Sequence, residues 1–289
     1  MRTWWPRLVR KLLALTALVI LGGLASATLV RFAPGYGVDE RELDPRLSGA
    51  SVEAMRAAHQ REANLLSYYA AYLRHAASGD LGTSESLQRP IAELIRQRFA
   101  VTARAVLLGT TIAWLAALLT VTFGHFLSGW IFETSSSLLS GLLLALPATV
   151  VALVFVWLRG PIFLAIACLT FPRLFRFLHH LLRQAKDQPH VLAAQARGIR
   201  PGRIFLRHVV LFALPAMVAL LGVSVSMAFG AAIPIEALTD TPGLGQLAWY
   251  AAINRDLPLI INVTLIVTLV TVASNFAADS SCRMALRLA

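Results

Sequence analysis

Charged residues are scarce in this chain. Asp, Glu, Lys and Arg make up 14% of its 289 residues, whereas a soluble domain carries about 25%. Acidic residues are the scarcer kind, with 15 Asp and Glu against 26 Lys and Arg, so the formal net charge is +11. Hydrophobic residues make up 57%. This balance excludes disorder, a solenoid of polar helices and most soluble enzymes, and it indicates a multi-span membrane protein.

Cysteine and catalytic motifs are also nearly absent. The two cysteines, Cys168 and Cys282, lie in no Cys-x-x-Cys or His/Cys spacing, which excludes a disulfide framework or zinc site recognisable from sequence. The chain has no GxSxG, HExxH or Walker A pattern and no pair of carboxylates within a span. Adjacent His179 and His180 would point about 100° apart on a helix. We therefore expect no catalytic residue, no metal site and no cofactor bound by this chain.

Long apolar runs are what the chain does contain. A bilayer core about 30 Å thick needs roughly 20 apolar residues as a helix, and none of the runs alternates as a strand would. We therefore predict an all-α integral membrane protein with six transmembrane helices. The runs are Leu12–Val30, Ala105–Phe123, Leu138–Leu158, Ile162–Phe177, Val209–Ile235 and Leu259–Ala278.

Basic residues predict the orientation. Arg2, Arg7, Arg10 and Lys11 precede the first run, which favours cytoplasmic N- and C-termini. The segments then expected inside (1–11, 124–137, 173–208 and 279–289) hold 14 Lys and Arg and three acidic residues, whereas those outside hold 12 of each kind. The whole net charge thus falls on the cytoplasmic side, and nucleic-acid binding is not needed to explain it. The alternative for the first run is a signal peptide cleaved near Ala25-Ser26-Ala27.

Residues 31–104 form an outside segment that we expect to be helical. Ser51 is a candidate N-cap with Glu53 in the first turn, and Gly79 can end the helix. Pro90 opens a second amphipathic stretch, expected to lie along the membrane surface before the second span. The segment either caps the membrane helices or docks a partner.

The longest inside loop, residues 178–208, predicts a short helix over Val191–Arg197. Gly198 suits the left-handed residue that ends it, and Pro201 can start the next helix. Small residues such as Ala193, Ala194 and Ala196 let a helix sit deep in a groove of another protein. Such a helix, joined to two spans, could transmit force from a cytoplasmic partner. The alternative is a basic loop on anionic lipid.

Three further patterns concern the last two spans. Pro242-Gly243-Leu244-Gly245 predicts a tight turn, and Glu236 before it either bonds to the turn or a partner or lies at the interface. Gly222, Ser226 and Gly230 recur every four residues, which allows close helix approach. One face of the sixth span is mildly polar and either lines a pathway or bonds to a neighbouring helix. Its members are Thr264, Thr268, Thr271 and Asn275.

Residues 190–215 resemble the EAA-type loop of permease subunits of ABC importers, nearest to the dipeptide/oligopeptide/nickel branch. The matching residues are Val191, Ala194, Ala196, Gly198, Arg207 and His208, with Arg197 in place of the usual Lys. Other motifs of the branch follow in order along nearly the whole chain. They are Arg31-Phe32-Ala33-Pro34-Gly35, Gly79-Asp80-Leu81-Gly82-Thr83-Ser84, Arg89-Pro90-Ile91, Glu236 with Pro242-Gly243-Leu244-Gly245, and Arg255-Asp256 with Pro258.

The chain departs from the branch at four places. Tyr36 replaces an Asp, and Leu192 stands where the general EAA motif has Glu. Only Arg159-Gly160-Pro161 separates the third and fourth runs, and Met284-Ala285-Leu286-Arg287 replaces a C-terminal Asp-Pro-Arg. These departures bear on substrate and partner contacts and leave room for a divergent, non-transporting paralogue or scaffold.

The resemblance implies the type I ABC importer permease fold in a bacterial cytoplasmic (inner) membrane. It divides the chain into residues 1–30, the outside segment 31–104 and a core permease domain 105–289. It implies an ATP-driven importer in which this subunit forms half of the solute pathway and is no enzyme itself. The implied partners are a second, usually unlike permease subunit, two cytoplasmic ATP-binding subunits and an extracytoplasmic binding protein. The implied cargo is di- or oligopeptide, with nickel or another small solute as the alternative.

The resemblance also assigns roles to residues. ATPase coupling falls on Val191, Ala193, Ala194, Ala196, Arg197, Gly198, Arg207 and His208. Docking of the binding protein falls on Glu236, Pro242, Gly243, Gly245, Arg255 and Asp256. The polar face Thr264, Thr268, Thr271 and Asn275 is the candidate pathway surface.

Overall fold

The computed structural model describes residues 16–18, 20–29, 65–126 and 130–288. Every secondary-structure element in these ranges is a helix, apart from an isolated antiparallel bridge between Thr83 and Pro90. The all-α prediction is therefore confirmed for the described ranges. The predictions for the basic N-terminus, the Arg31–Gly35 motif, Tyr36 and the Ser51 cap lie outside them.

Contacts along the chain define two compact units. The first unit holds the described residues up to Phe99 together with Leu247–Leu269. The second holds Ala100–Gln246 and the described residues from Val270 onward. Each unit is described by itself.

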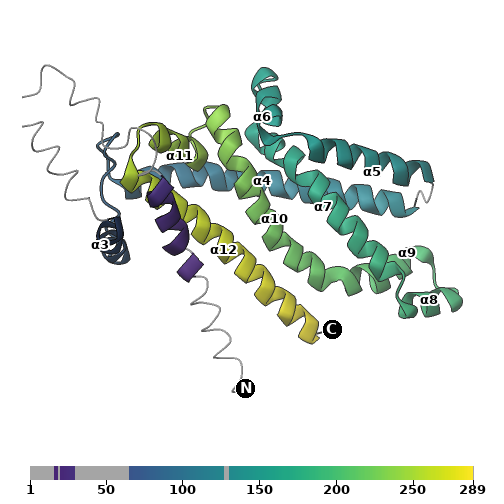
Figure 1. Ribbon diagram of the computed structural model, residues 1–289. Coiled ribbons are helices and arrows are strands. Elements are labelled where there is room, and N and C mark those ends of the chain that lie inside the picture. Colours follow the sequence, from purple (N-terminus) through teal and green to yellow (C-terminus); the bar gives the residue numbers. More distant parts are fainter. Residues whose placement is uncertain (1–15, 19, 30–64, 127–129, 289) are drawn as a thin grey trace, which may run out of the picture. The chain divides into compact units, whose positions relative to one another are not determined.

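Four stretches of helix are long and apolar enough to cross a membrane: Ile91–Gly124, Ile162–Lys186, Pro201–Leu238 and Leu257–Ala278. They belong to α4 (Ile91–Phe126), α7 (Ile162–Lys186), the continuous α9 (Pro201–Ile204), η2 (Phe205–Val210) and α10 (Leu211–Leu238), and α12 (Leu257–Leu288) (Figure 1). Residues 16–18 and 20–29 are helical and lie within the first predicted run, Leu12–Val30. The shorter helices are α3 (Leu65–Ala77), α5 (Trp130–Ala145), α6 (Ala148–Trp157), α8 (Pro189–Ala196) and α11 (Leu244–Ile253).

The third apolar run is not the single helix that its length predicts. It divides into α5 and α6, whose axes are bent by 91° at a break at Leu146 and Pro147. Pro147 has an extended backbone (φ −62°, ψ 146°) and is the N-cap of α6. Proline has no N–H to donate and its ring clashes with the preceding turn, so the helix ends before it and a new one begins.

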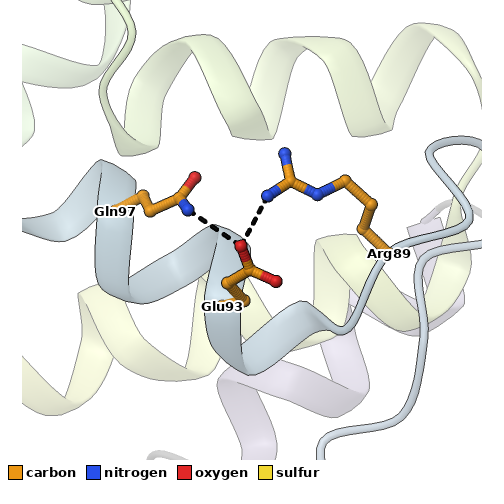
Figure 2. A network of polar contacts seen from close by, with 3 residues as sticks. All are labelled: Arg89, Glu93 and Gln97. Atoms are coloured by element: carbon orange, nitrogen blue, oxygen red, sulfur yellow. Dashed lines mark hydrogen bonds and ion pairs between the residues drawn. The ribbon is translucent and has the colours of Figure 1, made fainter.

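The stretch after Pro90 is also different from the prediction. It is not a separate surface helix, because α4 runs without interruption for 36 residues from Ile91 into the second span. At 1.5 Å per residue this helix is about 54 Å long, well over the hydrocarbon thickness. Figure 2 shows the polar network on its first turns, where Glu93 accepts from Arg89 at 2.7 Å and from Gln97 at 2.9 Å. These side chains are exposed, so each pair contributes only a few tenths of a kcal/mol.

The second unit has a continuous apolar core that joins α4, α7, α8, η2 and α10. Leu174 and Leu178 of α7 are fully buried in it. The indole N–H of Trp114 on α4 donates to Ser224 Oγ on α10 at 2.9 Å. A Cβ at Gly109 of α4 would lie 2.8 Å from the Phe163 carbonyl oxygen, so glycine is what allows α4 and α7 to approach closely.

Candidate functional site

The predicted loop helix is present as α8, which begins two residues earlier than expected, at Pro189. It ends in a Schellman motif, in which the residue after the C-cap has left-handed backbone geometry. Gly198 has φ +68° and donates to the Gln195 carbonyl at 2.9 Å, and Ile199 donates to the Ala194 carbonyl at 3.3 Å. The left-handed conformation predicted for Gly198 is therefore confirmed, and it satisfies two carbonyls that a helix end would leave unpaired.

Helix α8 has one buried and one exposed face. Val191 (0% exposed) and Ala194 (4%) belong to the same apolar core as α7, η2 and α10. Ala193 and Ala196 are exposed, and so is Leu192, at 58%. The buried face packs α8 into the same core as the spanning helices. Because close-packed interiors transmit strain, a displacement of α8 is passed on to those helices. The exposed face thus presents the large apolar side chain of Leu192 together with the small side chains of Ala193 and Ala196.

The other predicted coupling residues lie around this helix. Arg197 is its exposed C-cap, and Arg207 and His208 lie in the π-helix η2. A ring nitrogen of His190 in the first turn of α8 is 3.1 Å from the His208 carbonyl oxygen. The His190 ring also packs on Phe212, with centroids 5.1 Å apart. These contacts tie the start of α8 to η2 and to the first turn of α10.

The loop after α10 is organised around a buried carboxylate. Glu236 is 0% exposed, and its Oε2 accepts from the Gly245 N–H at 2.7 Å and from Thr102 Oγ1 at 3.0 Å. Thr102 Oγ1 also accepts from the Leu244 N–H at 2.8 Å. Glu236 thus bonds to the turn instead of lying at an interface. Thr102, on α4, was not predicted, because nothing in a lone threonine on an apolar helix marks it as a partner.

The two glycines of this loop are explained by space. A Cβ at Gly243 would overlap the Glu236 carboxyl group, and one at Gly245 would lie 2.6 Å from the Ile233 Cα. Neither has a positive φ, so it is close approach, not a left-handed turn, that requires glycine at these positions. The two glycines of the Pro-Gly-Leu-Gly sequence therefore allow the chain to fold tightly over the buried Glu236 side chain.

In the first unit, two distant motifs meet at Asp256. This carboxylate is 1% exposed and its Oδ2 accepts from Ser84 Oγ at 2.5 Å, from Ser86 Oγ at 2.7 Å and from the Ser86 N–H at 3.0 Å. Its Oδ1 accepts from the Leu259 N–H at 3.1 Å, which caps the start of α12. The Gly-Asp-Leu-Gly-Thr-Ser and Arg-Asp-x-Pro motifs therefore form one hydrogen-bonded unit.

A second polar link in the first unit involves α3 and α12. The Tyr72 hydroxyl donates to Asn262 Oδ1 at 2.5 Å, and Asn262 Nδ2 donates to the carbonyls of Leu81 (3.1 Å) and Pro258 (2.8 Å). Burial, and to a lesser degree the neighbouring Tyr69, raise the pKa of the Tyr72 phenol well above its ordinary value of 10.0. Asn262 was missed by sequence reasoning, since an isolated amide early in a span carries no motif.

The predicted docking residues divide by exposure. Pro242 and Arg255 are exposed, whereas the other four are buried: Glu236, Gly243, Gly245 and Asp256. The buried members form the hydrogen bonds and close contacts that shape the two loops. They can act on a partner only through the surface that they hold in place.

Residues of the polar face of α12 belong to both units, and most of them lie against another helix of the unit to which they belong. In the first unit, Thr264 Oγ1 is 3.1 Å from Ser26 Oγ, and a Cβ at Gly22 would lie 3.5 Å from Thr268 Oγ1. In the second, Ser226 Oγ donates to the Thr271 carbonyl at 3.3 Å. Asn275 is exposed.

The small-residue stripe on α10 explains one close approach. A Cβ at Gly222 would lie 2.5 Å from the Ser274 carbonyl oxygen, and Ser226 bonds to the same helix. Gly230 differs from the prediction, because it is exposed and has no atom within 4 Å of where a Cβ would be.

These apolar helices, with a short helix packed into their core, define a multi-pass integral membrane protein. The chain belongs to the family of binding-protein-dependent transport system inner membrane components, whose model matches residues 101–285. It is therefore a permease subunit of the ABC importer type, as the sequence motifs predicted.

Curated relatives align over most of the chain. A peptide permease protein of Brucella suis is 26% identical over 93% of this chain and 91% of its own length. The oligopeptide transport system permease protein OppB of Haemophilus influenzae is 28% identical over 87% of this chain and 88% of its own. OppB of Escherichia coli K12 is 26% identical over 83% and 84%.

Proposed function

We propose that this subunit forms half of the pathway of an ATP-driven importer of di- or oligopeptides. The observation that carries the proposal is the double nature of α8, whose buried face shares a core with α7 and α10 while its small-residue face is exposed. The named relatives, which are peptide permeases, support the cargo class. No observation in the described ranges favours nickel over peptide.

Coupling follows from the geometry of α8. Exposed Ala193 and Ala196 let the backbone of a cytoplasmic ATP-binding subunit approach the helix closely, and Leu192 offers an apolar anchor whose burial is worth about 1.5–3 kcal/mol. When two ATP-binding subunits close, they would displace α8, and the shared core would carry that displacement into α7 and α10. This subunit needs no chemistry of its own, only two conformations whose populations the partners shift.

The loop over Glu236 and the hydrogen-bonded motifs around Asp256 would face the side of the membrane opposite to α8, where a binding protein delivers cargo. Their buried carboxylates hold exposed Pro242 and Arg255 in fixed positions. A second permease subunit would complete the pathway. The polar face of α12 is proposed to contribute to it through Asn275, because the three threonines are at least partly engaged by neighbouring helices.

Orientation is tested by single cysteines introduced after both native cysteines are replaced. Ala193→Cys and Pro242→Cys are matched, because both positions are exposed. We expect a membrane-impermeant maleimide to label Ala193→Cys only from the cytoplasmic side and Pro242→Cys only from the outside. Labelling of both from one side would overturn the proposed topology.

The transport role is tested in proteoliposomes that contain this subunit, its partner permease and the ATP-binding subunits. We expect uptake of a labelled tripeptide only with the ATP-binding subunits, ATP and the binding protein all present. Uptake without the ATP-binding subunits would refute an ATP-driven mechanism. Uptake of ⁶³Ni²⁺ in place of peptide would assign the alternative cargo.

A further inference from the structure

A groove between α5 and α7 in the second unit is not used by the transport mechanism above. It has a volume of about 900 Å³ and is lined by residues of these two helices only. We propose that it binds the phosphate headgroup of an anionic phospholipid from the cytoplasmic leaflet. The leaflet rests on the orientation proposed above, whereas the groove and its chemistry do not.

One wall of the groove is a basic stripe on α7. Arg173, Arg176, His180 and Arg183 are spaced by three, four and three residues and therefore lie on one face of the helix. Arg173 and Arg176 are exposed, and no carboxylate pairs with them among the residues whose side chains the structure describes, which leave out Glu133. A pair of guanidiniums one helical turn apart suits a phosphate, because each presents a planar fork of N–H donors.

The facing wall, from α5, supplies hydroxyl groups. Thr134, Ser136, Ser137 and Ser140 line the groove, and the Ser137 side chain is exposed. The hydroxyl of Ser140 is used within its own helix, where it donates to the Ser137 carbonyl at 3.0 Å. The Ser137 hydroxyl, opposite the guanidiniums of α7, adds a donor on the second wall of a site for an oxyanion.

The two arginines lie where the fourth apolar run passes into the segment expected on the cytoplasmic side. Arg173 lies 11 residues after the first residue of α7 and Arg176 lies 14 after it. These steps correspond to about 16 and 21 Å along the helix, past the middle of a ~30 Å hydrocarbon core that begins at Ile162. Long arginine side chains near the end of a span extend to the interface, which is where the lipid phosphates lie.

The groove is also suited to the rest of a lipid. Its lining includes Leu138, Leu144 and Phe177 beside the polar groups. Leu138 is 63% and Phe177 53% exposed, so acyl chains can lie along them while the headgroup stays in the polar part. An acidic peptide or the carboxylate of a second subunit would leave this apolar lining without a partner. The amphipathic wall therefore favours lipid.

The test is native mass spectrometry of the full chain, incubated with equal amounts of phosphatidylglycerol and phosphatidylcholine. We expect preferential retention of phosphatidylglycerol. The variant R173Q/R176Q should lose it by roughly tenfold or more, because each basic residue contributes substantially to anionic-lipid binding. The matched control is R96Q/R104Q, which removes two exposed arginines of α4 that lie outside the groove.

A steric variant separates a site from general charge attraction. Ser137→Phe fills the groove but leaves every arginine in place, and we expect it to lower phosphatidylglycerol retention as well. Equal loss in R96Q/R104Q, unchanged retention in R173Q/R176Q or in Ser137→Phe, or equal retention of phosphatidylcholine would each overturn the proposal. Displacement of the lipid by millimolar inorganic phosphate would assign the site to a free anion instead. The mass-spectrometric readout needs neither ATP nor peptide, so the lipid-binding proposal can fail while the transport role stands, and the reverse.

Discussion

The packing of Gly243 against Glu236 makes the sharpest prediction about this protein. In Gly243→Ala the new methyl group would overlap the Glu236 carboxyl group, far inside the 3.5–4.0 Å of a normal carbon contact. Glu236 is fully buried near the end of α10, where its Oε2 accepts hydrogen bonds from Thr102 and Gly245. Because these two bonds hold the carboxyl group in place, we expect the loop to lift away from it.

The magnitude follows from the contacts that lifting breaks. The Gly245 N–H bond to Glu236 (2.7 Å) and the Leu244 N–H bond to Thr102 (2.8 Å) both come from the displaced segment. Such a bond contributes about 0.5–1.5 kcal/mol between neutral groups and about 1.5–3 kcal/mol when one group is charged. We expect Gly243→Ala to cost roughly 2–4 kcal/mol. The matched control, Gly230→Ala, has open space at its Cβ and should be neutral or stabilising by up to ~1 kcal/mol.

The assay is thermal unfolding of the purified protein, combined with a double-mutant cycle. Glu236→Ala removes the group that the methyl overlaps, so Gly243→Ala should cost less than ~1 kcal/mol in that background, a coupling of about 2 kcal/mol. Additive effects in the cycle would refute the packing argument. So would equal unfolding temperatures for Gly243→Ala and Gly230→Ala.

Three further predictions concern stability. Asp256→Ala should destabilise the protein by about 2–4 kcal/mol, measured by thermal unfolding, because four donors lose their acceptor; Ser86→Ala should cost under half as much. Gly222→Leu should lower the unfolding temperature more than Gly230→Leu, because only Gly222 faces the Ser274 backbone. The raised pKa of Tyr72 means that the neutral phenol stabilises the fold below pH 10, and this stability is lost as the pH rises toward the folded-state pKa. Alkaline unfolding should therefore begin at lower pH in wild type than in Tyr72→Phe.

The sequence predicted which runs are helical but not where they break. Pro147 separates α5 from α6 with a 91° bend, whereas Pro172, Pro215 and Pro234 lie inside α7 and α10. Neighbouring helices can compensate for a missing N–H in a membrane helix. The presence of a proline in the sequence therefore does not show whether a helix ends there, because that depends on how the helix packs against its neighbours.

The candidate site was predictable where local geometry decides it. Gly198 follows a short helix and must be left-handed, which needs no distant information. The acceptor role of Asp256 is half local, since Asp before a Leu-Pro helix start is an N-cap signal, but Ser84 lies 172 residues away in sequence. The Thr102 bond to Glu236 spans 134 residues. Such pairings depend on tertiary structure, which composition and spacing do not contain.

The central claim, that α8 passes movement from the ATP-binding subunits to the spans, is tested most directly by Gly198→Val against Gly202→Val. Both glycines have open space around a Cβ, but only Gly198 has a positive φ, at +68°. A β-branched residue there costs at least ~1–2 kcal/mol and should loosen the end of α8. We expect Gly198→Val to lower peptide uptake per ATP hydrolysed at least severalfold in proteoliposomes and to weaken co-purification of the ATP-binding subunits, while Gly202→Val stays near wild type. Equal uptake and equal co-purification in the two variants would contradict the claim.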